Sequence, residues 1–230
     1  MRRLIRCALF VACACFLFGA VTSPLSQVTV PGTDATLASL WQKVRPVDVN
    51  ASKLEFTAGS NKNPRTWSSC TVGVWVDTNG APKGIVRTTK AVLDDINSLG
   101  SVQLTYKGRV DDKGDADALA VANGGVVMAF ASNKSAEFSR TPSALAVYRP
   151  TATNGHASSG VLMVATNRFP DLPATGPTSQ HTLLAHEFLH AVGFAHSTDK
   201  NSIMSPQLGT SATITTDVQK LAPRLTPDHC

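Results

Sequence analysis

The sequence predicts an α+β fold in which a sheet of about five strands is combined with a few helices. Three observations support this prediction. Five short segments have the composition and alternation of strands, one segment is an amphipathic helix, and a histidine-rich segment has helical spacing. The chain has 230 residues, of which 43% are apolar and 16% are charged, as expected of a globular protein.

The expected elements follow one another from about Trp67. In Cys70–Gly80, alternating valines followed by Asn-Gly predict a strand and a turn. In Ile85–Gly100, apolar residues at helical spacing predict a helix that ends at the glycine. Four further strands are expected at 102–108, 124–132, 143–150 and 159–167. Two further helices are expected, one starting after Thr178 or Ser179 and a short one at 215–225.

The N-terminus has the features of a secretory signal. Arginines precede Cys7–Val21, an uncharged and mostly apolar run that is shorter than the roughly 20 residues of a membrane span. An uncleaved anchor, or a lipid on Cys13 or Cys15, is the alternative. The expected organisation is a signal peptide at 1–26, a short propeptide or N-terminal extension at 27–65, and the main domain at 66–230.

Removal of the signal changes the charge and the cysteine count. The formal net charge of +5 falls to about +2 because three arginines are lost, and no basic stripe for nucleic acid is left. No membrane span is expected after signal removal, and we expect a monomer. Of five cysteines only Cys70 and Cys230 remain. In an oxidising compartment they are expected to form a disulfide, with two free thiols as the alternative.

The segment Leu183–Pro206, "LLAHEFLHAVGFAHSTDKNSIMSP", carries the strongest chemical signal. His186 and His190 are four residues apart, so on a helix both rings can reach one metal ion. Glu187 lies beside the first histidine, where it can reach a water molecule activated by the metal without binding the metal. Neutral imidazoles suit zinc, and a catalytic zinc has three protein ligands.

A third ligand is expected from the continuation of the segment. Gly193 can end the helix in a left-handed conformation, after which the chain can reverse and bring His196 to the metal. The pattern is H-E-x-x-H-x-x-G-x-x-H. An amphipathic helix with core histidines would explain the apolar residues of this segment, but it would not explain the glycine or the third histidine.

The extended motif and a following methionine resemble the metzincin metalloproteases. Met204 lies eight residues after His196, and Ser197 follows that histidine directly, which is most similar to the matrixin branch, including secreted microbial members. Pro206 stands where the astacin-like and serralysin-like branches have a tyrosine. The resemblance implies a mixed, twisted sheet of about five strands, a backing helix, an active-site helix, a methionine turn and a C-terminal helix.

The resemblance also assigns roles to residues outside the motif. Met204 would form a hydrophobic floor beneath the zinc, and Asp217 would brace the methionine turn. The edge strand that pairs with substrate would comprise Ala144, Leu145, Ala146, Val147 and Tyr148. The propeptide cysteine that covers zinc in many matrixins is absent, because no cysteine lies between Cys15 and Cys70.

The function implied is that of a secreted zinc endopeptidase acting on proteins or peptides, with 66–230 as its catalytic domain. One catalytic Zn²⁺ would activate a water molecule, and Glu187 would act as general base and then general acid. The alternative is a catalytically weak, zinc-containing adhesion or binding module of the same fold. A protease with a distant glutamate as third ligand is disfavoured by Gly193 and His196.

Two weaker metal signals lie elsewhere in the chain. The four aspartates of Asp111–Asp117 could bind Ca²⁺, although a solvated charged loop is the preferred interpretation. His156 and His181 do not have the spacing of the structural zinc site of matrixins. We expect His181 to be a solvated residue of the first helical turn, and His156 and His229 to be exposed.

Overall fold

The computed structural model describes residues 54, 56, 66–111, 115–141, 143–153, 156–173, 175–176, 178–207, 213–227 and 229–230. All of them belong to one compact unit, Ala35–Cys230. The expected signal peptide and nearly all of the expected extension lie outside the described residues. Within the described part of the chain, no helix has the length and apolar character needed to cross a membrane.

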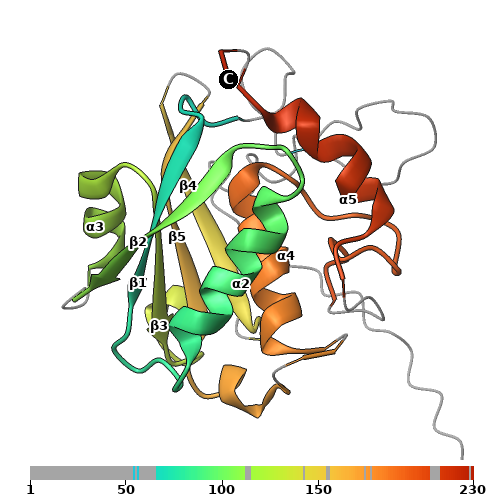
Figure 1. The fold of residues 1–230 in the computed structure, drawn as a ribbon. Helices are drawn as coiled ribbons and strands as arrows, with labels where there is room; N and C mark the ends of the chain where they lie inside the picture. Colours follow the sequence, from blue (N-terminus) through green and yellow to red (C-terminus); the bar gives the residue numbers. More distant parts are fainter. Residues whose placement is uncertain are drawn as a thin grey trace, which may run out of the picture. The chain divides into compact units, whose positions relative to one another are not determined.

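The centre of the domain is a five-stranded sheet in the order β2-β1-β3-β5-β4 (Figure 1). Strands β2, β1, β3 and β5 are parallel to one another, whereas the edge strand β4 pairs with β5 in the antiparallel direction. The mixed sheet and the α+β class predicted from the sequence are therefore confirmed. The strands are β1 (Thr71–Asp77), β2 (Gln103–Val110), β3 (Val126–Ala131), β4 (Ala146–Thr153) and β5 (His156–Ala165).

Helices pack on both faces of this sheet. Figure 1 shows α2 and α4 side by side on one face, with α3 on the other side of the sheet. The helices are α2 (Ile85–Asn97), α3 (Ala116–Asn123), α4 (Gln180–Val192) and α5 (Thr216–Leu221), with short 3₁₀ turns η2 (Ala136–Phe138), η3 (Phe169–Asp171) and η4 (Ala222–Leu225).

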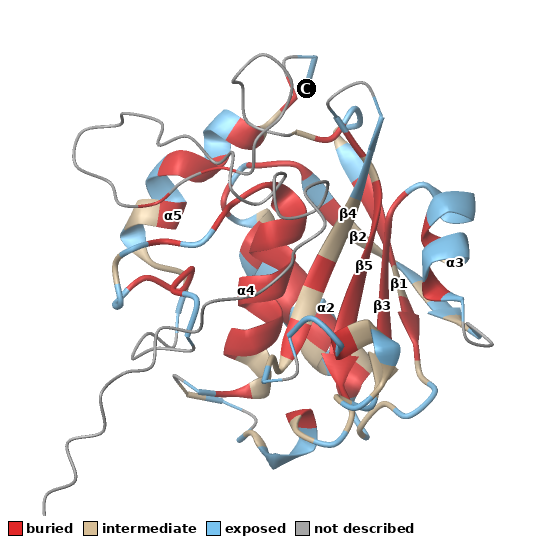
Figure 2. Ribbon diagram, turned by 180° about the vertical axis from the view of Figure 1, so that it is seen from behind, coloured by how far each residue is buried: buried red, intermediate tan, exposed pale blue. Residues whose placement is uncertain are grey.

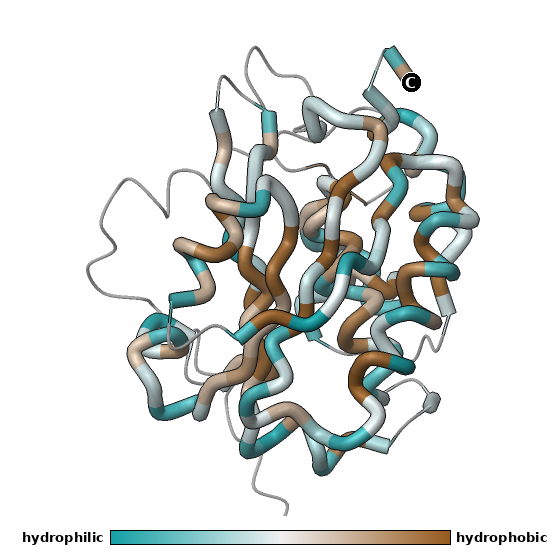
Figure 3. The backbone as a smooth tube through the Cα atoms, turned by 60° about the vertical axis from the view of Figure 1, so that its left-hand side comes forward, coloured by the Kyte–Doolittle hydropathy of each residue, from teal (hydrophilic) through white to brown (hydrophobic). Residues whose placement is uncertain are grey.

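Alternation along the strands divides the core into two parts. In β3, Val126 and Met128 pack against the α2 and α4 side, whereas Val127 and Ala129 pack toward α3. Successive side chains of a strand point to opposite faces, so a strand covered on both faces reads as a continuous apolar run. Figure 2 shows most of α4 buried and the outer side of α3 exposed. Figure 3 shows hydrophobic residues along the strands.

Element boundaries differ from the sequence prediction where side chains redirect the chain. Helix α2 ends at Asn97 rather than Gly100, because the Asn97 amide turns to bond both the N–H and the C=O of Leu104 at 2.8 and 2.9 Å. The sequence prediction left 151–158 outside the strands, but residues 151–153 extend β4 and residues 156–158 extend β5. Pairing with a neighbouring strand satisfies their backbone groups whatever their polarity.

Helix α3 was missing from the sequence prediction. Asp115 caps it by accepting a hydrogen bond from the N–H of Ala118 at 2.8 Å. Asp117 pairs with Arg149 at 2.9 Å, and Asp111 accepts a hydrogen bond from Asn79 at 3.0 Å. These aspartates therefore have protein partners in this part of the chain, and Ca²⁺ binding remains an untested prediction.

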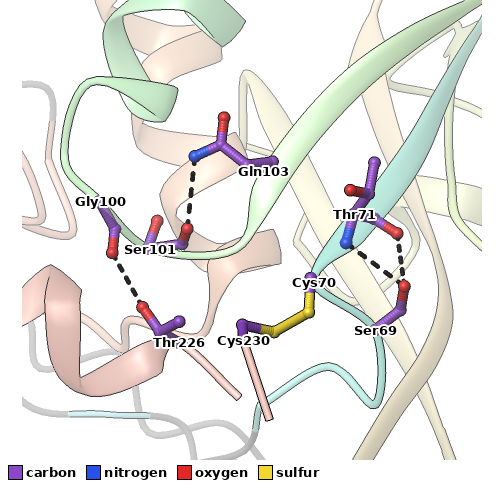
Figure 4. Close-up of a disulfide and its surroundings, with 8 residues drawn as sticks. All are labelled: Ser69, Cys70, Thr71, Gly100, Ser101, Gln103, Thr226 and Cys230. Carbon is purple, nitrogen blue, oxygen red and sulfur yellow. Dashed lines mark hydrogen bonds between the residues drawn. A yellow bond between two sulfur atoms is a disulfide. The ribbon is translucent and has the colours of Figure 1, made fainter. Parts of the chain in front are cut away.

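The expected disulfide is confirmed. Cys70, directly before β1, is bonded to Cys230, which is 160 residues later in the chain, with a Cα–Cα distance of 5.5 Å (Figure 4). Nearby, the Thr226 hydroxyl donates to the Gly100 carbonyl at 2.8 Å. The segment after η4 is thereby attached to the edge of the domain at two places.

Replacing both cysteines by serine is expected to lower the free energy of unfolding by about 2–5 kcal/mol, because the crosslink restricts a long loop in the unfolded chain. Guanidinium unfolding of the double variant and of the wild type measures the difference. Wild type unfolded in the presence of a thiol reductant should lose a similar amount. Equal stability of the oxidised wild type and the double variant would show that the bond contributes nothing.

Candidate metal centre

The candidate site is built on helix α4 and the turn after it. Ser179 caps the helix, accepting from the N–H of Thr182 at 3.1 Å, as one of the two expected caps. The helix ends at Val192, and Gly193 follows with φ 132°, a conformation that side chains with a Cβ rarely adopt. The expected break after the helix is therefore present, and the chain reverses toward His196.

Three imidazoles meet at one point. The Nε2 atom of His190 lies 3.0 Å from Nε2 of His186 and 3.2 Å from Nε2 of His196. Four ligands at 2.0–2.1 Å in a tetrahedron are separated by about 3.3 Å, so these spacings are close to those of a tetrahedral ion site. The structure thus brings together all three histidines predicted from the sequence.

In two of the three imidazoles, a backbone carbonyl determines which ring nitrogen faces the cluster. Nδ1 of His186 lies 2.7 Å from the Ile203 carbonyl, and Nδ1 of His190 lies 2.8 Å from the Phe194 carbonyl. A carbonyl only accepts, so each Nδ1 carries the proton and each Nε2 presents a lone pair. Lone pairs that face one another repel, and a cation between them removes that repulsion. The donor set therefore fits a metal ion.

Burial keeps the two helical imidazoles neutral. Both rings are buried, and desolvation lowers the pKa of His186 to about 4 and the pKa of His190 well below its usual value. His196 stays solvent-exposed on the open side, yet partial desolvation by the surrounding chain lowers its pKa as well. Neutral imidazole is the form that binds a metal ion, so the site is prepared for one at neutral pH.

Glu187 is a buried carboxyl next to these ligands. It is 5% exposed, and no hydrogen-bond or ion-pair partner for it occurs among the described residues. Desolvation raises its pKa to about 8. A carboxyl in this condition beside a cluster of ligands is a candidate for proton transfer, since its pKa lies near neutral pH.

The methionine segment is bonded to the site through its backbone. Met204 is fully buried, and its carbonyl accepts a hydrogen bond from the N–H of Ser197 at 2.7 Å. The Met204 N–H donates to the hydroxyl of Ser202, which in turn donates to the Asp217 carboxylate at 2.8 Å. Asp217, in the first turn of α5, is thus connected to the turn that supplies the Ile203 carbonyl to His186.

The other residues singled out in the sequence occupy different places. Of Ala144–Tyr148, the last three residues open the edge strand β4, and Ala144 and Leu145 precede it. His156 and His229 are exposed, as expected. His181 lies in the first turn of α4, as expected, but its ring is only partly exposed and lies 3.1 Å from the Asp95 carboxylate of α2. Helix packing brings that carboxylate within reach.

A second group of candidate ligands is Cys70, His229 and Cys230. Because the two sulfurs are bonded to each other, neither is available as a thiolate. Among the described residues, the three histidines around α4 therefore form the group compatible with a metal ion.

Comparisons with known proteins add little to this geometry. No protein family and no curated protein matches the sequence. One similar solved structure is metalloproteinase-II from Bacteroides fragilis, with 10% sequence identity and a TM-score of 0.43. The similarity covers 71% of this chain and 55% of that one, so the chain spans about half the length of that protein.

Two features around the site were not predicted from the sequence. The carbonyls of Phe194 and Ile203 orient the imidazoles, but every residue type has a carbonyl, so no sequence pattern marks them. Leu54 and Phe56, inside the expected extension, are also buried in the same core as α4.

Proposed function

We propose that this chain is a secreted zinc-dependent endopeptidase of the matrixin-like metzincin type. The observation that carries the proposal is the convergence of three Nε2 atoms, two of which belong to rings whose Nδ1 is bonded to a backbone carbonyl. Three neutral imidazoles, with one exposed ring on the open side, favour zinc with a position left for water. The signal-like N-terminus and the disulfide support secretion.

When bound, Zn²⁺ supplies Lewis-acid activation of a water molecule and of the scissile carbonyl. Glu187 takes a proton from the attacking water and then delivers it to the leaving amine nitrogen. Its raised pKa in the metal-free chain keeps it protonated at neutral pH, and a nearby positive charge favours the carboxylate that a base requires. With Pro206 in place of a tyrosine, this part of the chain offers no phenol to the reacting carbonyl.

The edge strand β4 is the proposed binding site for the peptide. Edge strands leave backbone groups unpaired, and an extended peptide can add to them by backbone hydrogen bonds. The proposed residues are Ala144, Leu145, Ala146, Val147 and Tyr148. Helix α4 packs against β4, so a peptide on this edge is held near the histidines.

Casein hydrolysis by the purified protein tests the proposal. Activity is expected with one zinc per chain, loss is expected after removal of zinc by a chelator, and return is expected when zinc is added back. Hydrolysis that is insensitive to the chelator would contradict it. One bound zinc without any hydrolysis would instead identify a binding module.

A further inference from the structure

We propose that Leu54 and Phe56 belong to the active domain and that Phe56 is a positioning residue for the metal centre, acting through Phe194. The inference rests on the proposed zinc site. It places the start of the working domain before Leu54, whereas the sequence alone suggested a short propeptide or N-terminal extension up to residue 65.

Burial is the first argument. Leu54 is 1% exposed and Phe56 is 2% exposed, and both lie in the same hydrophobic core as α4 and the methionine turn. Loss of a segment that fills a core exposes apolar surface and removes packing, so it destabilises the fold. A segment released on activation is expected to lie on the surface instead.

Contact with the ligand-bearing turn is the second argument. Phe56 forms an antiparallel bridge with Phe194, and the two rings lie 5.6 Å apart. The guanidinium of Arg224 in η4 lies 5.4 Å from the centre of the Phe56 ring. Phe56 therefore contacts both the turn after α4 and the C-terminal part of the domain.

Phe194 is the residue through which this contact reaches the site. Its carbonyl accepts the Nδ1 proton of His190 at 2.8 Å, and it lies two residues before His196. Loss of a partner that orients a ligating histidine typically lowers metal affinity by about 10–100-fold. A shift of the Phe194 backbone therefore disturbs one ligand directly and another through the chain.

Trp67, which also precedes the sheet, contacts the end of α4, directly before the turn that contains Phe194. The indole N–H of Trp67 donates to the Ala191 carbonyl at 2.7 Å, in the last turn of α4. Residues that precede β1 therefore contact two nearby backbone positions: Trp67 bonds the Ala191 carbonyl, and Phe56 forms a bridge with Phe194. We define Leu54, Phe56 and Trp67 as the N-terminal clamp.

The test compares Phe56→Ala with Phe138→Ala in the full-length secreted protein. Phe138 is also fully buried but packs on the α3 side of the sheet, so its loss destabilises the fold without touching the turn. Co²⁺ titration, read from its visible absorption, measures metal affinity. Phe56→Ala is expected to weaken Co²⁺ binding about tenfold, Phe56→Leu less, and Phe138→Ala not at all.

Hydrogen exchange in the metal-free protein tests the clamp independently of any zinc chemistry. Backbone amides of residues 189–197 are expected to exchange faster in Phe56→Ala than in Phe138→Ala. Equal exchange rates and equal Co²⁺ affinities in the two variants would overturn the proposal that Phe56 positions the metal centre. Wild type that binds no Co²⁺ would overturn the proposed function, with the exchange result still deciding the packing role.

The N-terminus of the active protein gives a last check. Sequencing of the mature secreted chain is expected to show a start before Leu54. A fully active chain that begins after Phe56, or higher peptidase activity in Phe56→Ala, would show that the segment is an inhibitory one and would overturn the inference.

Discussion

Glu187→Gln is expected to lower kcat/KM on a peptide substrate by about 10²–10⁴-fold while zinc still binds. The amide has nearly the shape of the carboxyl but cannot take up and release a proton. Peptidase assays and metal analysis of the same preparation measure the two quantities separately. Because the buried carboxyl has no partner among the described residues, the substitution should leave the fold intact.

Asp94→Asn is the matched control for this prediction. Asp94 is an exposed carboxylate of α2 and belongs to no group of candidate metal ligands among the described residues, so its variant should keep wild-type activity and wild-type zinc content. Undiminished turnover of a general protein substrate by Glu187→Gln would remove Glu187 from the mechanism. Loss of zinc from that variant would place it among the ligands instead.

His196→Ala is expected to reduce zinc affinity strongly. Loss of a residue that only orients a ligand lowers metal affinity by roughly 10–100-fold, and loss of the ligand itself should cost more. His196 is the exposed member of the cluster, and Nε2 of His190 is 3.2 Å from its Nε2, so its removal takes away one of three protein donors. Chelator competition measures the affinity, and peptidase activity should fall with zinc occupancy.

His156→Ala is the control for His196→Ala. If this variant keeps wild-type zinc affinity and activity, the loss in His196→Ala does not come from replacing an exposed histidine in general. His156 is also exposed, at the start of β5, and its ring belongs to no candidate group of ligands among the described residues. A fully metallated and active His196→Ala protein would rule out a site of three histidines.

Prediction from the sequence succeeded where the physical signal is local. The valines of β1, the helical spacing of His186 and His190, and Gly193 after the helix each depend on a few neighbouring residues. It failed where partners come from distant segments. Asn97 ended α2 early by bonding Leu104, and His181 was partly covered by Asp95 of another helix.

The acidic stretch shows why composition can mislead. "DDKGDAD" read as a charged loop, yet Asp115 caps α3 and Asp117 pairs with Arg149 of the edge strand β4. The apolar content of α3 is mainly alanine, so its helical periodicity is weak, and the helix forms on the far face of the sheet. Packing on the sheet supplies the stabilisation that the local pattern does not.

The sequence by itself determined which residues are candidate metal ligands, which carboxyl lies beside them, and where the helix that presents them ends. Those properties follow from residue type and helical spacing. Only the tertiary structure decided which carbonyls orient the imidazoles, how far Glu187 is buried, and that Leu54 and Phe56 lie in the core. These depend on contacts between segments far apart in the chain, which the order of residues does not encode in any local pattern.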